Sequence, residues 1–172
     1  MNIEKGIKDM KIIIHDMDIN FSEKISEKAD KIIIADGRYA PCQGCFKCWT
    51  KHPASCELKD SLNEISRMIG QADELIIITE NCYGGHSPNI KRILDRGIGI
   101  STPMSTYRGK LMHHTLRYGK HDTLRVFVYG DVSEKEKETW KLMIKSNSLN
   151  NGFRKSEVIF TSEAELKEGK II

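Results

Sequence analysis

Residues 74–79 read Glu-Leu-Ile-Ile-Ile-Thr, and two similar runs precede them, Lys-Ile-Ile-Ile-His at 11–15 and Lys-Ile-Ile-Ile-Ala at 31–35. Continuous β-branched runs of this length are typical of strands that are buried on both faces of a sheet. Two further runs, Thr123–Tyr129 and Glu157–Phe160, complete the set. Amphipathic stretches separate the runs, so the sequence predicts a parallel sheet with helices on both faces.

Helices are expected between these strands. The predicted helices cover Phe21–Ala29, Ser61–Gly70, Pro88–Arg96 and the stretch from the capping box of Ser133 and Glu136 to about Asn150. One more short helix is expected after Ser162, whereas Gly97–Asp122 is expected to be long and irregular. Five strands alternating with helices predict a flavodoxin-like three-layer α/β sandwich with a five-stranded parallel sheet of order 2-1-3-4-5.

Ligands of such sheets bind at the carboxyl ends of the strands. The loops that follow the predicted strands there are Asp16–Asn20, Asp36–Glu57, Glu80–Ser87 and Gly130–Val132. These loops are therefore the candidates for a functional site.

Length and composition narrow the class of protein. The chain has 172 residues, of which 39% are hydrophobic and 30% charged, as expected for one domain over residues 1–172 with residues 1–10 as an N-terminal extension. A net charge of +3 is too small to indicate a nucleic-acid-binding face. The sequence has no apolar run long enough to span a membrane and no secretory signal at its start. We therefore expect a cytoplasmic protein that binds neither nucleic acid nor membranes.

Four of the five cysteines, Cys42, Cys45, Cys48 and Cys56, are crowded into one loop. Four thiolates at this spacing can surround a metal ion or a cuboidal iron–sulfur cluster. Structural zinc sites more often pair two separated Cys-x-x-Cys halves. Free cysteine is also a small hydrophobic residue that buries well, so the spacing alone leaves packed free thiols as an equal alternative.

The cysteine loop belongs to a longer pattern. Residues 41–49 read Pro-Cys-Gln-Gly-Cys-Phe-Lys-Cys-Trp, and Pro53, Cys56 and Asp60 follow. This pattern resembles the signature of the flavodoxin-like NAD(P)H-dependent FMN reductases, and the four cysteines are also similar to the compact motif of iron–sulfur flavoproteins. The likeness extends over about residues 11 to 160, and its further elements are Asn81–Ser87, Lys91, Asp95 and Arg96.

The resemblance implies a function and a site. It implies an FMN-dependent oxidoreductase that takes hydride from NADH or NADPH, passes electrons to a small-molecule or protein acceptor, and assembles as a dimer or tetramer. The cofactor-binding residues that it implies are Asn81, Cys82, Tyr83, Gly84, Gly85, Ser87, Gly130 and Asp131. The similarity to iron–sulfur flavoproteins implies a four-iron cluster on Cys42, Cys45, Cys48 and Cys56. No catalytic side chain is identified, and His86 is expected to be an exposed loop histidine.

Three stretches depart from the family pattern. Family members follow the first strand with a Ser- and Gly-rich loop whose N–H groups hold the FMN phosphate. This chain has His15-Asp-Met-Asp-Ile-Asn20 there, with no glycine, and Asp16 and Asp18 would repel a phosphate dianion. The second departure is Glu80-Asn81, where the family often has Ser-Pro or Thr-Pro, and a carboxylate there would disfavour reduced, anionic flavin. A smaller departure is Ala54, where the family has glycine.

The missing phosphate loop leaves alternatives open. The phosphate could be held by basic groups of residues 108–121, from this chain or a neighbouring subunit. Alternatively the chain is an iron–sulfur flavoprotein that transfers single electrons, or a flavodoxin-fold protein that has lost its flavin and serves a binding or structural role. The leading prediction is the flavin-dependent NAD(P)H oxidoreductase.

Overall fold

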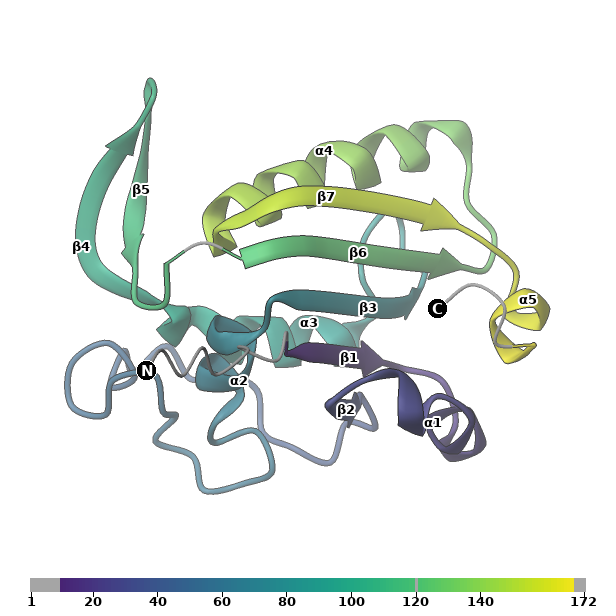
Figure 1. The fold of residues 1–172 in the computed structure, drawn as a ribbon, viewed down its shortest axis with the longest axis horizontal. Helices are drawn as coiled ribbons and strands as arrows, with labels where there is room; N and C mark the ends of the chain where they lie inside the picture. The colour runs from purple at the N-terminus through teal and green to yellow at the C-terminus, as the bar shows by residue number, and fades with distance from the viewer. Residues whose placement is uncertain (1–9, 120, 169–172) are drawn as a thin grey trace, which may run out of the picture.

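The computed structural model describes residues 10–119 and 121–168, so nearly all of the expected N-terminal extension lies outside the described residues. Its centre is a five-stranded parallel sheet of order β2-β1-β3-β6-β7 (Figure 1). The strands are β1 (Lys11–His15), β2 (Lys31–Ile34), β3 (Glu74–Glu80), β6 (His121–Tyr129) and β7 (Phe153–Phe160). With the separate pair β4–β5 set aside, this is the predicted order 2-1-3-4-5, and the flavodoxin-like fold is confirmed.

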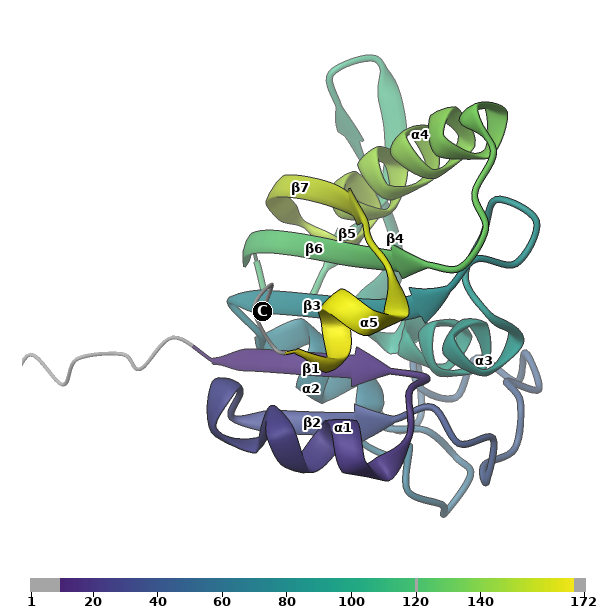
Figure 2. The same ribbon diagram turned by 90° about the vertical axis from the view of Figure 1, so that its right-hand side faces the viewer.

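Helices lie on both faces of the sheet (Figures 1 and 2). One face carries α2 (Ile65–Gln71), α3 (Pro88–Arg96) and α4 (Glu134–Asn151). The other carries α1 (Ile19–Lys24), the 3-10 turn η1 (Ser26–Lys28) and α5 (Glu163–Lys167). The predicted capping box of Ser133 and Glu136 begins α4, and the short helix expected after Ser162 is present.

The isoleucine runs divide their side chains between two cores. Ile12 and Ile14 of β1 pack toward α2, α3 and α4, whereas Ile13 packs toward α1 and α5. All three are fully buried. Burying each such side chain stabilises the fold by about 1.5–3 kcal/mol. Continuous burial on both faces explains why these strands show no alternation of apolar and polar residues.

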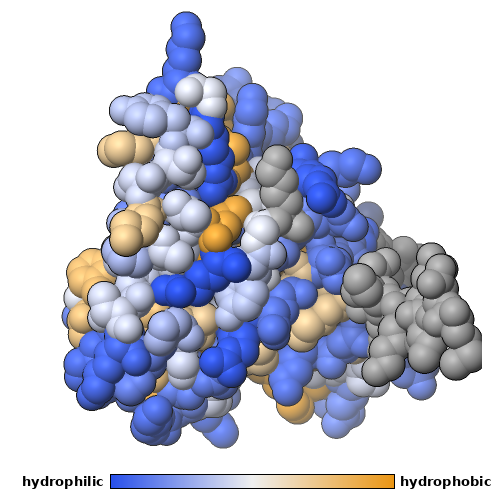
Figure 3. All heavy atoms as spheres, turned by 60° about the vertical axis from the view of Figure 1, so that its left-hand side comes forward, coloured by the Kyte–Doolittle hydropathy of each residue, from blue (hydrophilic) through white to orange (hydrophobic). Residues whose placement is uncertain are grey.

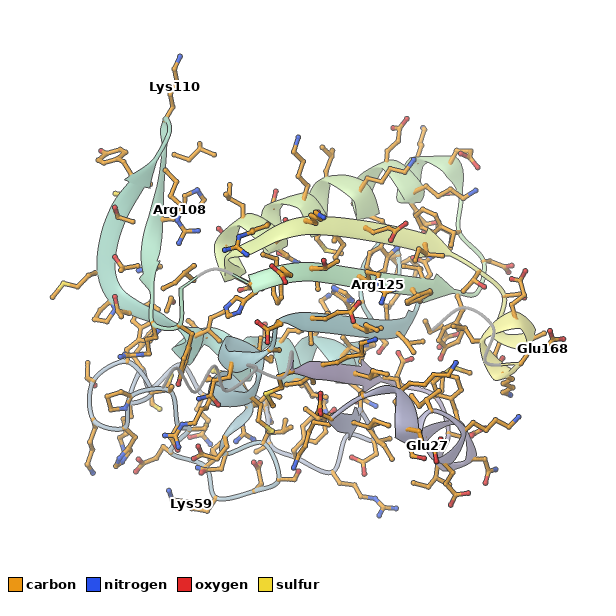
Figure 4. All side chains as sticks on the ribbon, in the orientation of Figure 1. Glu27, Lys59, Arg108, Lys110, Arg125 and Glu168 are labelled. Atoms are coloured by element: carbon orange, nitrogen blue, oxygen red, sulfur yellow. The ribbon has the colours of Figure 1, made fainter. Side chains whose placement is uncertain are left out.

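The face covered by α1 and α5 is only partly covered, because these helices have six and five residues. Where they end, charged side chains take over: Glu74 of β3 pairs with Lys11 of β1 at 2.9 Å and with Arg125 of β6. Figure 4 labels Arg125 on the open part of the sheet. These opposite charges lie side by side on three neighbouring strands and stabilise this solvent-exposed part of the sheet.

The segment Gly97–Asp122 is not irregular, and that prediction is wrong. A 3-10 turn η2 (Gly97–Ile100) leads into an antiparallel hairpin of β4 (Ser101–Arg108) and β5 (Leu111–Leu116), which projects from the body in Figure 1. Gly109 makes the turn with a φ of 62°, a value that favours glycine. Most of the hairpin side chains are exposed, so its sequence lacks the apolar pattern of a buried strand.

Several predicted boundaries also shift. The first helix ends at Lys24 rather than Ala29, and the second begins at Ile65 rather than Ser61. Strand β7 begins at Phe153, four residues before the predicted Glu157. The residues between them, 154–156, are polar and exposed, so they carry no apolar pattern that predicts a strand. No helix within residues 10–119 and 121–168 is long and apolar enough to cross a membrane.

Candidate functional site

The carboxyl ends of three strands are joined by the side chain of Asp16, which follows β1. Its carboxylate accepts hydrogen bonds from the Glu80 N–H at 3.1 Å, the Thr79 hydroxyl at 3.2 Å and the Tyr129 hydroxyl at 3.0 Å. Burial and the charge of Asp16 raise the pKa of Tyr129, so this hydroxyl stays protonated and donates. A carboxylate of the chain itself therefore occupies the centre of the expected ligand edge.

The first loop does not fit a phosphate dianion. The Asp18 side chain caps α1 and accepts from the Phe21 N–H at 2.9 Å, so the loop's own carboxylate satisfies the helix start. The charge of Asp16 stands beside it, and α1 has only six residues. Phosphate sites at helix starts need free N–H groups and no competing anion. The place where the resembling family holds the FMN phosphate is thus occupied by carboxylates of this chain.

The second loop is a tight turn that presents Tyr83. The Cys82 N–H donates to the Gly85 carbonyl at 2.9 Å, and the Gly85 N–H donates back at 3.1 Å. Tyr83 and Gly84 between them have φ values of 52° and 77°, as in the turns that close two-residue hairpins. The Tyr83 side chain is 96% exposed. An exposed aromatic ring at a sheet edge offers a stacking surface to a planar ligand.

Asn81 holds this loop to its neighbour. Its side-chain amide donates to the Asp131 carbonyl at 2.7 Å, while its oxygen accepts from the Trp140 indole at 2.8 Å and the Gly84 N–H at 3.1 Å. The residues 81–87 and 130–131, predicted to bind the cofactor, are therefore brought together. The role of Asn81 in this structure is to position the loop.

The other predicted cofactor residues fall into two groups. The side chains of Cys82 and Asp131 are partly or fully open to solvent, as is that of Tyr83. Ser87 is buried and serves as the N-cap of α3, where it accepts from the Ile90 N–H. Gly130, with a φ of 89°, lies against Glu80. Contact of these residues with a cofactor stays a prediction.

His86 is not an exposed loop histidine, and that expectation is wrong. Its side chain is 3% exposed and packs edge-on against Trp140 with ring centroids 4.8 Å apart. Burial, with the nearby charge of Lys91, lowers the pKa of His86 to about 4. The imidazole is therefore neutral at physiological pH. No sequence signal distinguishes a buried histidine from an exposed one in such a turn.

The cysteine loop runs beneath the sheet, from the end of β2 back along α3 to the base of the hairpin (Figure 1). Trp49 anchors its far end by donating to the Ile98 carbonyl at 2.9 Å and packing against the His114 ring, with the ring centroids 4.7 Å apart. Beside Trp49, Cys48 is buried. This anchoring places the predicted ligands at the carboxyl end of α3.

The four predicted ligands differ in exposure. Cys42 and Cys45 are exposed, Cys56 is intermediate and Cys48 is buried. Burial raises the pKa of the Cys48 thiol, and the negative charges of Cys56, Cys42 and Cys45 add to the rise. The four thiols are therefore close enough to influence one another. A bound metal or cluster would stabilise the thiolate forms that burial disfavours.

Among the described residues, no three His, Cys, Asp or Glu side chains are arranged to hold a metal ion. A single zinc ion therefore does not fit the loop as it stands. A cuboidal four-iron cluster is larger than one ion and takes its thiolates farther apart, so it needs a different spacing. Cluster binding by Cys42, Cys45, Cys48 and Cys56 stays a prediction.

A buried cation lies beside Cys56. Arg96 at the end of α3 is 1% exposed, pairs with Asp60 and donates to the Ala40 carbonyl at 3.2 Å. Burial works to lower the pKa of Arg96, but hydrogen bonds and charges of Asp60 and Cys56 raise it overall. The Asp60 and Arg96 positions of the family pattern thus meet in space, where they tie the cysteine loop to α3.

The two predicted redox regions are separate within one chain. The 81–87 loop precedes α3, whereas Trp49 and Arg96 lie at the other end of that helix. Nine residues of α-helix span about 13 Å. The basic segment 108–121 is also at this far end, where Arg108 donates to backbone carbonyls of Leu149 and His114 (Figure 4). It does not supply the missing phosphate site within this chain.

No family model matches the sequence. A stretch of 65 residues is 34% identical to an iron-sulfur flavoprotein from Methanocaldococcus jannaschii, covering 38% of this chain and 33% of that protein. The chain thus matches about a third of the length of this curated relative. The likeness extends to a short stretch of sequence, not to a whole protein.

Solved structures share the fold. An NAD(P)H:quinone oxidoreductase from Methanothermobacter marburgensis superposes with a TM-score of 0.54 at 15% identity, covering 94% of this chain and 93% of that one. An FMN-dependent NADH-azoreductase from Bacillus anthracis, solved with FMN, gives a TM-score of 0.58 at 13% identity and the same coverage. At these identities the likeness shows the fold. The chain is therefore similar to both groups of proteins that its sequence resembles.

Proposed function

We propose that this protein is a flavin-dependent NAD(P)H oxidoreductase whose flavin ring lies at the carboxyl edge of the sheet. The observation that carries the proposal is the turn at Cys82–Gly85, which presents an exposed Tyr83 beside the Gly130–Asp131 turn. The shared fold with two NAD(P)H-dependent reductases supports it. FMN is the cofactor that the sequence resemblance implies.

The chain's own residues would hold and shield the ring. A flavin, when bound, supplies the hydride and electron chemistry, and the protein supplies position and electrostatics. Asn81 fixes the loop, and Tyr83 offers a face for stacking. Asp16 and Glu80 make the edge acidic and disfavour a phosphate group at the first loop.

The test is a flavin titration of the purified protein, read by its visible spectrum and by quenching of flavin fluorescence. Wild type should bind at micromolar concentrations, and Tyr83→Ala should weaken binding by about two- to tenfold, because stacking contributes about 0.5–1.5 kcal/mol. Tyr107→Ala, which removes a tyrosine that is 75% exposed on the hairpin, is the matched control. A colourless protein that binds no flavin would refute the proposal and favour a binding or structural role.

The second candidate is an iron–sulfur flavoprotein with a four-iron cluster on Cys42, Cys45, Cys48 and Cys56. One observation favours it: a curated relative with a matching stretch is an iron-sulfur flavoprotein. Iron and sulfide analysis after anaerobic purification separates the candidates. Cys48→Ser should abolish the iron content and Cys82→Ser should leave it unchanged, whereas less than about one iron per wild-type chain contradicts the cluster.

We further propose a cytoplasmic homo-oligomer of single-domain chains, a dimer or tetramer, that passes electrons to a small molecule or protein and does not bind nucleic acid. The hairpin supports assembly: an isolated two-stranded sheet is marginal in water. Its exposed apolar side chains are Met104, Tyr107, Leu111 and Met112. Light scattering after size exclusion measures the assembly, and a monomer would contradict it.

A further inference from the structure

A cavity of about 610 Å³ lies on the α2–α3–α4 side of the sheet, and Tyr83 is not among the residues that line it. Side chains of β3 and β6 form its floor, α3 and α4 form its walls, and the hairpin stands at its open end. Figure 3 brings forward the side of the molecule that carries the hairpin and shows hydrophobic atoms there between hydrophilic side chains. A volume of this size is in the range that small-molecule sites occupy.

The interior of the cavity is apolar. Leu75 and Ile77 of β3, Leu124 of β6 and Met143 of α4 line it. Toward the hairpin the lining becomes polar, and Lys91 and Asp95 of α3 stand at the wall with opposite charges. The charges of these two residues cancel, so the α3 wall favours neither anions nor cations. Such a lining favours an uncharged ligand with a large apolar part.

One buried polar side chain lines this cavity without a partner. His86 is 3% exposed, and neither of its ring nitrogens has a hydrogen-bond partner within the described part of the chain. Buried polar atoms in native proteins are nearly always hydrogen-bonded, and each exception calls for a ligand or water. Burial lowers the pKa of His86 to about 4, so the ring is neutral and carries one donor and one acceptor.

The ring of His86 is held in place for such a contact. It packs at 90° against Trp140, whose own indole N–H is committed to Asn81. Because Trp140 is itself fully buried, the imidazole has a fixed wall behind it. A ligand group that reaches the imidazole meets a preorganised partner, which reduces the ordering cost of binding.

We propose that this cavity binds a neutral, mainly apolar aromatic molecule that carries a hydroxyl or carbonyl group, and that His86 hydrogen-bonds to that group. A hydroxyl can donate to one form of the imidazole or accept from the other, and a carbonyl accepts from its N–H. The cavity shares His86 with the loop that presents Tyr83, but the ligand proposed for it does not depend on the proposed oxidoreductase activity.

The test uses 1-naphthol and naphthalene, two ligands of similar shape that differ in one hydroxyl. Titration calorimetry should show that wild type binds 1-naphthol about tenfold more tightly than naphthalene, the effect of one buried hydrogen bond. In His86→Phe this preference should vanish while naphthalene still binds. His52→Phe, at a histidine outside the cavity, should behave as wild type. Thermal unfolding confirms that each variant is folded.

A second variant tests the location. Met143→Trp adds bulk to the cavity wall and should weaken both ligands by at least tenfold, since it removes the space that they share. Absence of binding to wild type would overturn the proposal. So would an unchanged preference for 1-naphthol in His86→Phe, or undiminished binding of both ligands by folded Met143→Trp.

Discussion

The indole nitrogen of Trp140 donates a 2.8 Å hydrogen bond to the side-chain oxygen of Asn81, and so ties the middle of α4 to the loop that ends β3. The same oxygen accepts from the Gly84 N–H, and the amide on the other side reaches the Asp131 carbonyl. One asparagine thus sets the relative position of two loops and a helix. This is a structural reason for a polar residue at a position where the resembling family often has proline.

Removal of the Asn81 side chain should therefore destabilise the protein. Asn81→Ala leaves the buried indole N–H of Trp140 without its partner, and we expect the free energy of unfolding to fall by about 1–3 kcal/mol in urea titrations. Asn150→Ala removes only an exposed contact to His113 and should change it by less than about 0.5 kcal/mol. Equal effects of the two changes would contradict a central role for Asn81.

The carboxylate of Asp16 in the loop after β1 predicts a preference for a flavin without a phosphate group. Wild type should bind riboflavin at least as tightly as FMN, because Asp16 repels the phosphate dianion. Asp16→Asn should strengthen FMN binding by about tenfold and leave riboflavin nearly unchanged. Glu23→Gln, an exposed carboxylate of α1, is the control for a general charge effect. A strong wild-type preference for FMN would show that the phosphate is held elsewhere on the protein.

Buried His86 predicts a loss of stability in mild acid. Its pKa is about 4 when folded and near 6.5 when unfolded, so below pH 6.5 the unfolded chain binds the extra proton. The free energy of unfolding should fall by up to about 3 kcal/mol as the pH drops from 6.5 toward 4. His86→Phe should flatten this slope and stabilise the protein at pH 5. The buried His15 and His121, whose pKa values are also lowered by burial, supply the slope that remains.

The pair of Arg96 and Asp60 should be costly to break. Asp60→Asn leaves a buried guanidinium without its counter-charge, and we expect a loss of about 3–5 kcal/mol. Glu134→Gln removes one partner of an exposed pair with Lys137 on α4 and should leave the free energy of unfolding nearly unchanged. Chemical denaturation at neutral pH measures the free energy of unfolding of both variants. Similar losses for the two variants would mean that burial adds nothing to the Arg96 pair.

At Ala54 the structure suggests that a glycine would raise the stability of the protein. Its φ of 62° lies in the left-handed region, which costs a residue with a Cβ about 1–2 kcal/mol. Ala54→Gly, which restores the residue of the resembling family, should therefore raise the unfolding free energy by about 1 kcal/mol. Ala40→Gly, without positive φ, should lower it instead. A loss at both positions would show that the buried methyl group of Ala54 outweighs the strain.

The sheet was predictable because its information is local. Three consecutive isoleucines at 12–14 are buried on both faces, and that burial is visible in the sequence as an uninterrupted apolar run. The hairpin was not, because the side chains of Ser101–Arg108 are mostly exposed and carry no apolar pattern. Gly109 was its only local signal, and one glycine does not distinguish a hairpin from a loop.

The candidate site was predictable only in part. The sequence shows that the loop after β1 lacks glycine and contains Asp16, which predicts a poor phosphate site. It does not show that Asp16 binds Thr79 and Tyr129, because these lie 63 and 113 residues away along the chain. The burial of His86 depends in the same way on Trp140, a residue of a distant helix. Contacts of this kind follow from the topology and not from local pattern.

The hairpin gives the molecule two units of different local stability. Among the described residues its strands pair with each other alone. Arg108 donates to the Leu149 carbonyl and His113 contacts Asn150 at the end of α4, and Trp49 packs against His114. Amide protons of β4 and β5 should therefore exchange with solvent through local opening, while those of β1 and β3 await global unfolding. A molecule that binds the hairpin would slow amide exchange in β4 and β5 first, so exchange at these strands measures association directly.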